Sequence, residues 1–190
     1  MLELSNGMIL YHGSYTPITK IDLNKCLAGK DFGKGFYLTA SLKQAQNFVH
    51  LSVRRAVLNR LVPFDRNYGY VTLFRYIDGP FVRPLYFESA NIDWLHYVAG
   101  NRDSSIFPDI VQQYSKYNVI GGKIANDQTT ATLQAYVDAV NGIPGDPRVD
   151  KLTIEALLPN RLENQFCFKT EEALDALVYM ESERYEFNGK

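Results

Sequence analysis

The sequence has few cysteines and no histidine cluster, and these absences argue against metal chemistry. Its 190 residues contain two cysteines, Cys26 and Cys167, which stand far apart and show no metal-ligand spacing. Two such thiols suit a reduced intracellular protein as well as an exported one with a disulfide, so they decide little. None of the three histidines, His12, His50 and His96, has a cysteine or carboxylate companion at zinc spacing. We therefore expect no metal site.

Long apolar runs and an excess of charge are also missing. The 20 Lys plus Arg and 21 Asp plus Glu give a net charge of -1, which leaves no global field for nucleic acid or an anionic membrane. No segment approaches the ~18 uncharged apolar residues of a membrane helix, and the N-terminus lacks a basic stretch followed by a long apolar run. The expectation is a cytoplasmic protein with no membrane partner.

What the sequence does contain is ordinary globular composition with many aromatic residues. Hydrophobic residues make up 46% and aromatic residues 13%, with 13 Tyr and 11 Phe. This composition argues against disorder. A chain of this length can bury a substantial core as one domain, and we predict a single domain over residues 1–190.

The first third of the chain shows a strand, a turn, a second strand and a helix. Apolar residues 8–12 predict a strand that ends at Gly13-Ser14, and residues 36–39 predict another after a flexible turn over residues 30–35. Ser41, with Gln44 three residues later, has the form of a capping box. Apolar residues at helical spacing follow as far as Ala56, so a helix is expected there.

The rest of the chain mixes strands and helices without regular alternation. Strands are expected at 70–76, 84–88, 117–120 and 165–169, and Gly121-Gly122 would follow the third of them. Helices are expected at 92–99, which Asn91 would cap and Gly100 would end, and at 130–140. A last helix is expected to begin after Thr170, with Leu177 and Val178 on its apolar face and Glu181, Glu183 and Glu186 on a solvated face. This order favours a mixed α+β domain.

Three kinds of residue in the first fifty positions suit the cleavage of nicotinamide from NAD. A residue without a side chain can offer its backbone to the nicotinamide carboxamide, a histidine can bind ribose hydroxyls, and an aromatic ring can stack on the nicotinamide. Tyr11-His12-Gly13-Ser14 carries the first two, and Tyr37 and Phe48 offer rings. The spacing of these motifs favours a nucleotide site, although His12 alone could be structural and Phe48 could belong to the core.

These motifs resemble the NAD-binding half of the ADP-ribosyltransferases of the diphtheria-toxin and poly(ADP-ribose) polymerase branch. The resemblance covers the His12-Gly13-Ser14 segment, the Gly33-Lys34-Gly35-Phe36-Tyr37 segment and Phe48. It implies an ADP-ribosyltransferase-like split antiparallel β-sheet with surrounding helices. It also implies that His12, Gly13, Ser14, Gly35, Tyr37 and Phe48 bind NAD, with His12 and Tyr37 also taking part in catalysis.

The whole chain also resembles the bacterial DUF3990 family, which is thought to belong to the same group of folds. Residues 31–39, 94–102, 117–127 and 165–174 carry this resemblance. It implies a toxin–antitoxin arrangement, with a small antitoxin as the partner. Asp127 could contact a ligand or acceptor, and a turn or helix-cap role is equally compatible with its position.

The sequence departs from the transferase pattern at Gln165. In the transferases a glutamate at this position grips the nicotinamide ribose and stabilises the positive charge of the transition state. Gln165 can hydrogen-bond the ribose but brings no negative charge, and a lost electrostatic contribution of this kind costs about 10²–10³ in rate. Glu163, two residues earlier, could supply the charge from the same strand face or be merely solvated.

Two hypotheses follow. The first is an NAD-dependent ADP-ribosyltransferase that modifies an unknown protein or nucleic-acid acceptor, with Gln165 among its catalytic residues. The alternative is a module that binds NAD or ADP-ribose without transferase chemistry, which the missing glutamate motivates. Release of nicotinamide from NAD distinguishes them.

Overall fold

The computed structural model describes residues 3–124, 127–157 and 162–187, and it forms two compact units. One, here called the His12 unit, comprises Leu4–Ile21, Tyr37–Pro80 and Leu174–Lys190. The other, the Gln165 unit, comprises Met1–Glu3, Asp22–Phe36 and Phe81–Ala173. Both contain a sheet and at least one helix, so the prediction of a mixed α+β fold is confirmed. The single-domain prediction stays a prediction.

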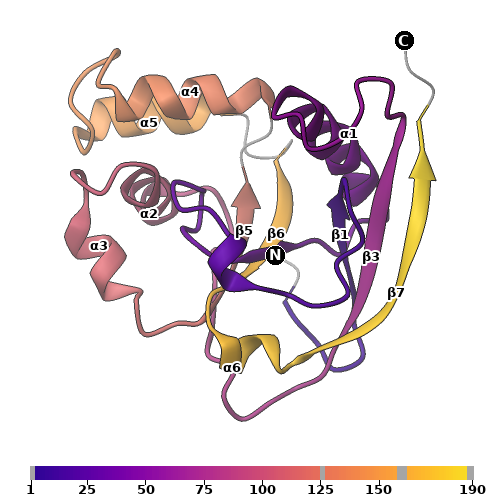
Figure 1. Cartoon of the computed structure of the whole chain (residues 1–190). Helices are drawn as coiled ribbons and strands as arrows, with labels where there is room; N and C mark the ends of the chain where they lie inside the picture. Colours follow the sequence, from indigo (N-terminus) through magenta and orange to yellow (C-terminus); the bar gives the residue numbers. More distant parts are fainter. Residues whose placement is uncertain (1–2, 125–126, 158–161, 188–190) are drawn as a thin grey trace. The chain divides into compact units, whose positions relative to one another are not determined.

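The sheet of the His12 unit is antiparallel, in the order β1-β3-β7 (Figure 1). Its strands are β1 (Ile9–Ser14), β3 (Tyr68–Tyr76) and β7 (Leu177–Glu186). Gly13 and Ser14 pair with Val71 and Tyr70, so both belong to β1 and do not form the turn that was predicted after residue 12. Pairing with β3 keeps both residues extended, although glycine and serine are typical turn residues.

Helix α1 (Leu42–Leu58) packs against this sheet and begins where the capping pattern predicts. Ser41 is the N-cap, and its hydroxyl accepts a hydrogen bond from the Gln44 N–H. Ala45, Val49 and Val53 are buried and form a hydrophobic cluster with Val71 of β3. Burial of this stripe stabilises the helix more than its intrinsic propensity does.

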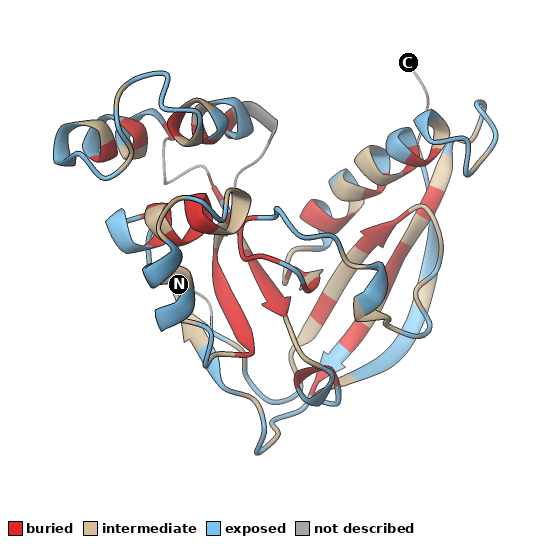
Figure 2. Cartoon of the chain, turned by 60° about the vertical axis from the view of Figure 1, so that its left-hand side comes forward, coloured by how far each residue is buried: buried red, intermediate tan, exposed pale blue. Residues whose placement is uncertain are grey.

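The sheet of the Gln165 unit is mixed, and its two central strands are mostly buried. Its strands are β4 (Pro84–Tyr86), β5 (Val119–Ile124) and β6 (Glu163–Phe168), and the sheet order is β2-β6-β5-β4, with β2 (Phe36–Leu38) beginning in this unit at Phe36. β4 runs parallel to β5, and β5 runs antiparallel to β6. Figure 2 shows β5 and β6 buried along most of their length.

Helices surround this sheet, and two of them were not predicted. The helices are α2 (Ile92–Arg102), α3 (Pro108–Gln113), α4 (Asp127–Val137), α5 (Pro147–Ala156) and the short α6 (Glu171–Leu174), preceded by a 3-10 turn, η1 (Leu23–Lys25). The sequence patterns missed α3 and α5, which both begin with a proline. Gly100 lies inside α2 and does not end it. A glycine is needed there because a Cβ atom would lie 3.0 Å from the Ile106 carbonyl oxygen and 2.8 Å from Val111 Cγ2.

The predicted C-terminal helix is wrong. Only Glu171–Leu174 is helical, and Leu177 and Val178 begin β7, which pairs with β3 over its whole length. Glu181, Glu183 and Glu186 are exposed on this strand (Figure 2). Hydrogen bonding to β3 stabilises the extended conformation of a segment whose glutamates would suit either structure.

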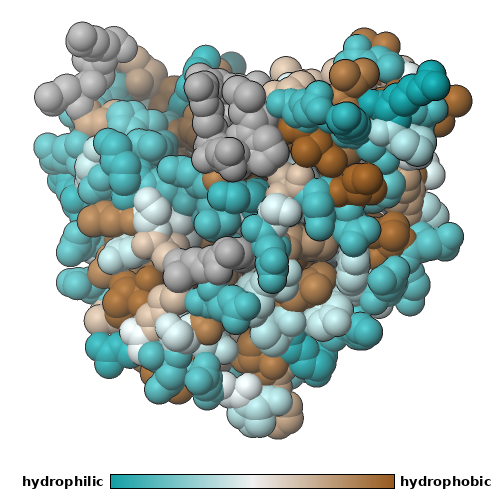
Figure 3. Space-filling view, turned by 180° about the vertical axis from the view of Figure 1, so that it is seen from behind, coloured by the Kyte–Doolittle hydropathy of each residue, from teal (hydrophilic) through white to brown (hydrophobic). Residues whose placement is uncertain are grey.

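The surface in Figure 3 is mainly hydrophilic, with separate apolar patches. Within the described ranges, no helix is long and apolar enough to cross a membrane.

Candidate functional site

The outer edge of β1 is the feature of the His12 unit that can hold an amide ligand. The Tyr11 N–H donates to the Thr39 carbonyl oxygen at 2.8 Å, and the Thr39 N–H donates to the Tyr11 carbonyl oxygen at 3.0 Å. Because backbone groups alternate in direction along a strand, the N–H and C=O of Gly13 point to the same edge as those of Tyr11. Beyond the short bridge to Thr39, this edge carries one donor and one acceptor at Gly13.

Gly13 is required by the close approach of α1. A Cβ atom on Gly13 would lie 2.1 Å from the Ala45 carbonyl oxygen and 3.0 Å from the Val49 nitrogen. Gly69, on the neighbouring strand, has the same role, since its Cβ would lie 2.5 Å from Val49 Cγ1. The two glycines let the helix backbone sit directly on the sheet.

His12 is held in one tautomer by the strand segment that carries Tyr37. Its Nδ1 lies 2.8 Å from the Tyr37 carbonyl oxygen, which can only accept, so Nδ1 carries the proton. Burial lowers the pKa of His12, and this effect outweighs the hydrogen bond to Tyr37, which raises it. A neutral ring with Nδ1–H leaves Nε2 as a hydrogen-bond acceptor.

The segment after β1 is fixed to neighbouring elements. Ser14 is 6% exposed. The Tyr15 N–H donates to the Ser52 hydroxyl of α1 at 3.0 Å, and the Ile18 N–H donates to the Thr72 hydroxyl of β3 at 3.2 Å. These bonds hold the loop that follows the His-Gly-Ser motif.

Tyr37 and Phe48 are both half-buried, as ligand-stacking rings must be. Phe48 is not part of the buried cluster that Ala45, Val49 and Val53 form with Val71. It stands at the side of the buried stripe of α1, four residues after Gln44 and on the same helix face. The structure thus gives a position compatible with the ligand interpretation of Phe48.

Two predicted site residues, Gln165 and Gly35, lie in the Gln165 unit. Gln165 is 5% exposed on β6 and pairs with Gly122 of β5. β6 begins at Glu163, so Glu163 and Gln165 share one strand face, with Glu163 exposed. A Cβ on Gly35 would lie 2.4 Å from Cys167 Sγ, so packing against β6 accounts for this glycine without a ligand.

The segment predicted as a flexible turn before Tyr37 is largely buried. Asp31, 7% exposed, accepts hydrogen bonds from Arg102 Nε at 2.9 Å and Nη2 at 2.7 Å. Phe32 is fully buried against Tyr97. Arg102 therefore anchors this turn. Trp94 is fully buried and donates from Nε1 to the Lys123 carbonyl oxygen.

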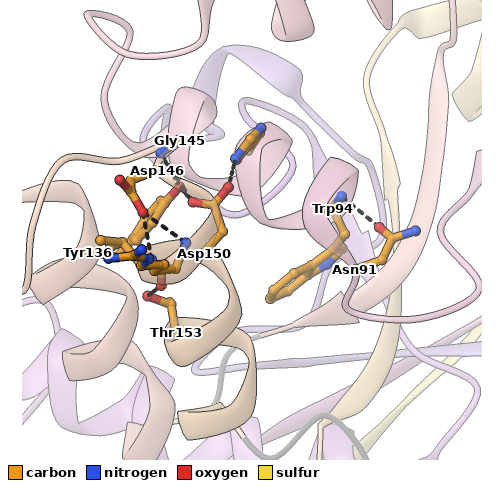
Figure 4. A network of polar contacts seen from close by, with 10 residues as sticks. Asn91, Trp94, Tyr136, Gly145, Asp146, Asp150 and Thr153 are labelled. Carbon is orange, nitrogen blue, oxygen red and sulfur yellow. Dashed lines mark hydrogen bonds and ion pairs between the residues drawn. The ribbon is translucent and has the colours of Figure 1, made fainter.

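The sequence patterns missed a buried polar network between α2, α4 and α5 (Figure 4). Asp150 accepts from the Tyr136 hydroxyl at 2.6 Å and the Gly145 N–H at 3.1 Å, and its other oxygen lies 2.7 Å from His96 Nε2. Burial and the Asp150 carboxylate raise the pKa of Tyr136. His96 also stacks on Phe107, with ring centroids 4.0 Å apart. The network joins three helices and, in the part of the chain described, presents no nucleophile to the histidine.

Asp127 begins α4, but its side chain lies outside what the structure describes.

Comparison with known proteins gives one match. The model of the family described as "Protein of unknown function (DUF3990)" matches residues 8–179. No curated protein and no solved structure matches the chain.

Proposed function

The chain belongs to the DUF3990 family, and we propose that it is an NAD-dependent ADP-ribosyltransferase. In this proposal the His12 unit binds NAD through His12, Gly13, Ser14, Tyr37 and Phe48. The acceptor is a protein or a nucleic acid.

The observation that carries the proposal is the outer edge of β1 at Gly13, where no backbone partner appears among the described residues. One N–H and one C=O lie on this edge, next to the bridge between Tyr11 and Thr39. A primary carboxamide has a complementary acceptor and donor, so it can pair with Gly13 as a neighbouring strand would. The edge thus fits the carboxamide of nicotinamide, the group that leaves when NAD is cleaved.

The state of His12 supports a role in binding ribose. A neutral imidazole with the proton on Nδ1 has its acceptor at Nε2. A ribose hydroxyl can donate to that nitrogen, whereas a protonated ring could not accept from it. The hydrogen bond to Tyr37 keeps the ring in this tautomer.

The half-buried rings of Tyr37 and Phe48 supply stacking partners for nicotinamide. Such a contact contributes roughly 0.5–1.5 kcal/mol beyond the area it buries. Ser14 adds a hydroxyl next to Gly13 on the same strand. The role of Gly35 in binding NAD stays a prediction, because its packing against Cys167 already requires a glycine.

Gln165 motivates the second candidate function, a module that binds NAD or ADP-ribose without transfer. The side chain is buried and uncharged, and the carboxylate nearest along the strand, Glu163, is exposed. A transferase with Gln165 would stabilise the ribosyl cation through an amide dipole alone, so slow chemistry is expected.

A thermal-shift titration with NAD tests binding. Ligand at ~100 times its dissociation constant adds about 2.7 kcal/mol to stability. Phe48→Ala should lose several-fold of the affinity for NAD but little of the affinity for ADP-ribose, which lacks the ring. Phe64→Ala is the matched control, because Phe64 is 90% exposed in the same unit. An unchanged melting temperature across millimolar NAD would refute the site.

Nicotinamide release tests the chemistry. Gln165→Glu should accelerate cleavage of NAD if the transferase assignment holds, because it adds a carboxylate with almost no change in volume. A wild type that is silent and becomes active with this substitution would favour the binding module. Labelled NAD with protein and nucleic-acid fractions of a lysate identifies the acceptor class, and absence of labelled product would count against the enzyme. The toxin role and the antitoxin partner stay predictions.

A further inference from the structure

Gln44, in the first turn of α1, has a buried amide that the fold satisfies at one end only. Gln44 is 2% exposed. The Ser41 N–H donates to the Thr39 hydroxyl oxygen at 3.0 Å, and the Thr39 hydroxyl in turn donates to Gln44 Oε1. This chain of bonds fixes Oε1 as the acceptor and leaves Nε2 as the other end of the amide.

Gln44 Nε2 has no hydrogen-bond partner within the described structure. Buried amide groups are almost always paired, and an unpaired donor costs free energy that an apolar side chain would not. The capping function does not require it, since the backbone N–H of Gln44 and the Ser41 hydroxyl make the cap. Methionine would fill the same volume without an unpaired donor.

Two neighbours of Gln44 connect it to the edge of β1 at Gly13. Its partner Thr39 is the residue that bridges to Tyr11, two residues before Gly13 on the same strand edge. The carbonyl oxygen of the next residue, Ala45, is the atom that a Cβ on Gly13 would strike. Phe48 follows four residues later on the same helix face. Gln44 is thus bonded to the residue that bridges to Tyr11, adjacent in the chain to the residue that covers Gly13, and on the helix face that carries Phe48.

We propose that Gln44 is a specificity-determining residue that donates from Nε2 to the carboxamide oxygen of nicotinamide. The inference rests on the proposed function and names a recognition element within the same site. A carboxamide oxygen has two lone pairs and its nitrogen has two protons. The Gly13 N–H takes one lone pair, the Gly13 carbonyl accepts from the amide nitrogen, and Gln44 Nε2 takes the second lone pair.

The test compares two ligands on one variant. Gln44→Met should weaken NAD binding about three- to tenfold, which is the range expected for one neutral hydrogen bond. ADP-ribose lacks the carboxamide, so its affinity should change less than twofold. Gln46→Met is the matched control, because Gln46 is half-buried on the same helix and both ligands should bind as to wild type. Isothermal titration of wild type and both variants with each ligand gives all six dissociation constants.

Gln44→Glu keeps the oxygen that accepts from the Thr39 hydroxyl, and it is the variant to use in the same titrations if Gln44→Met does not fold. Its carboxylate has no proton to donate and would face the lone pairs of the carboxamide oxygen, so NAD should again lose more affinity than ADP-ribose. The ratio of the two affinities is the quantity that a merely structural residue would not move.

The outcomes separate this inference from the proposed function. NAD bound equally by wild type and Gln44→Met would overturn the role of Gln44 and leave the NAD site standing. Equal weakening of both ligands would make Gln44 structural and also overturn the inference. A wild type that binds neither ligand would overturn both proposals.

Discussion

Substitution of Gly13 by alanine is the most direct test of how α1 and the sheet fit together. An alanine Cβ would lie 2.1 Å from the Ala45 carbonyl oxygen and 3.0 Å from both the Ala45 carbonyl carbon and the Val49 nitrogen. These atoms belong to the helix backbone, which cannot rotate away as a side chain can. Either the helix must lift from the sheet or β1 must bend.

The expected cost follows from this geometry. Overpacking of a well-packed interior costs about 1–3 kcal/mol, and a clash with backbone belongs to the upper end of that range. For a chain of this size, each kcal/mol lowers the melting temperature by roughly 2–4 °C. We therefore expect Gly13→Ala to melt about 6–12 °C below wild type, with a smaller denaturant midpoint.

Gly7→Ala is the matched control, because Gly7 tests conformation without crowding. Its φ is +85°, and a Cβ there would meet nothing within 4 Å. The left-handed region costs alanine about 1–2 kcal/mol, partly offset by a less flexible unfolded chain. Circular-dichroism melts of both variants give the comparison. Gly13→Ala melting within about 2 °C of wild type would show that α1 does not approach β1 as closely as described.

Three other predictions concern stability. Arg60→Gly and Ala139→Gly should each raise the free energy of unfolding by up to about 1 kcal/mol, because φ is +58° and +55° at these positions; a lower melting temperature would contradict this. Arg102→Leu should lower the free energy of unfolding by about 3–5 kcal/mol, because it removes the guanidinium that pairs with the buried Asp31 carboxylate, and a loss under 1 kcal/mol would refute the anchor. The pKa of His12 lies below its unfolded value of 6.5, so the stabilisation that its neutral ring provides is complete above pH 6.5 and is lost as the pH falls. His12→Asn should therefore make the melting temperature depend less on pH below 6.5. An unchanged slope would show that His12 does not cause this dependence.

The local signals in the sequence were reliable where local chemistry decides. Ser41 and Asn91 cap helices at the predicted positions, each accepting from the N–H three residues later. The capping box is only half formed, because the Gln44 side chain bonds to Thr39 and not to the Ser41 N–H. Whether a side chain turns back to its own helix or toward a neighbouring strand depends on tertiary contacts that no short pattern contains.

The prediction was wrong at glycines whose missing side chain makes room for a neighbouring element. Gly13 and Gly122 were expected to follow strands, and Gly100 to end a helix, yet all three lie inside their elements. A Cβ on Gly122 would lie 3.1 Å from Phe32 Cζ. Sequence patterns treat glycine as a breaker because it favours turns. They cannot show that a helix or ring will occupy the space its missing side chain leaves.

The C-terminal segment was misassigned because its pairing partner lies about a hundred residues away. Leu177–Glu186 places Ser182 opposite Thr72, with the two hydroxyls 2.9 Å apart. The register shifts at Leu73/Phe74, which interrupts the alternation that would have marked a strand. Glu181 and Glu183 are two residues apart, which suits a strand, and Glu186 follows three residues later, which suits a helix. The partner strand therefore decides the conformation.

For the candidate site, the motifs located the residues but not what holds them. The sequence named His12 and Tyr37 together, and in the structure the His12 ring bonds to the Tyr37 backbone, a contact that no pattern of side chains could reveal. Likewise, Gly13 was named for its backbone groups, while the structure adds a requirement for space under α1. Since both demands fall on one residue, loss of NAD binding in Gly13→Ala cannot by itself assign a ligand role. Phe48 and Gln44, whose side chains can be changed without moving the backbone of β1, are the positions at which binding and folding separate.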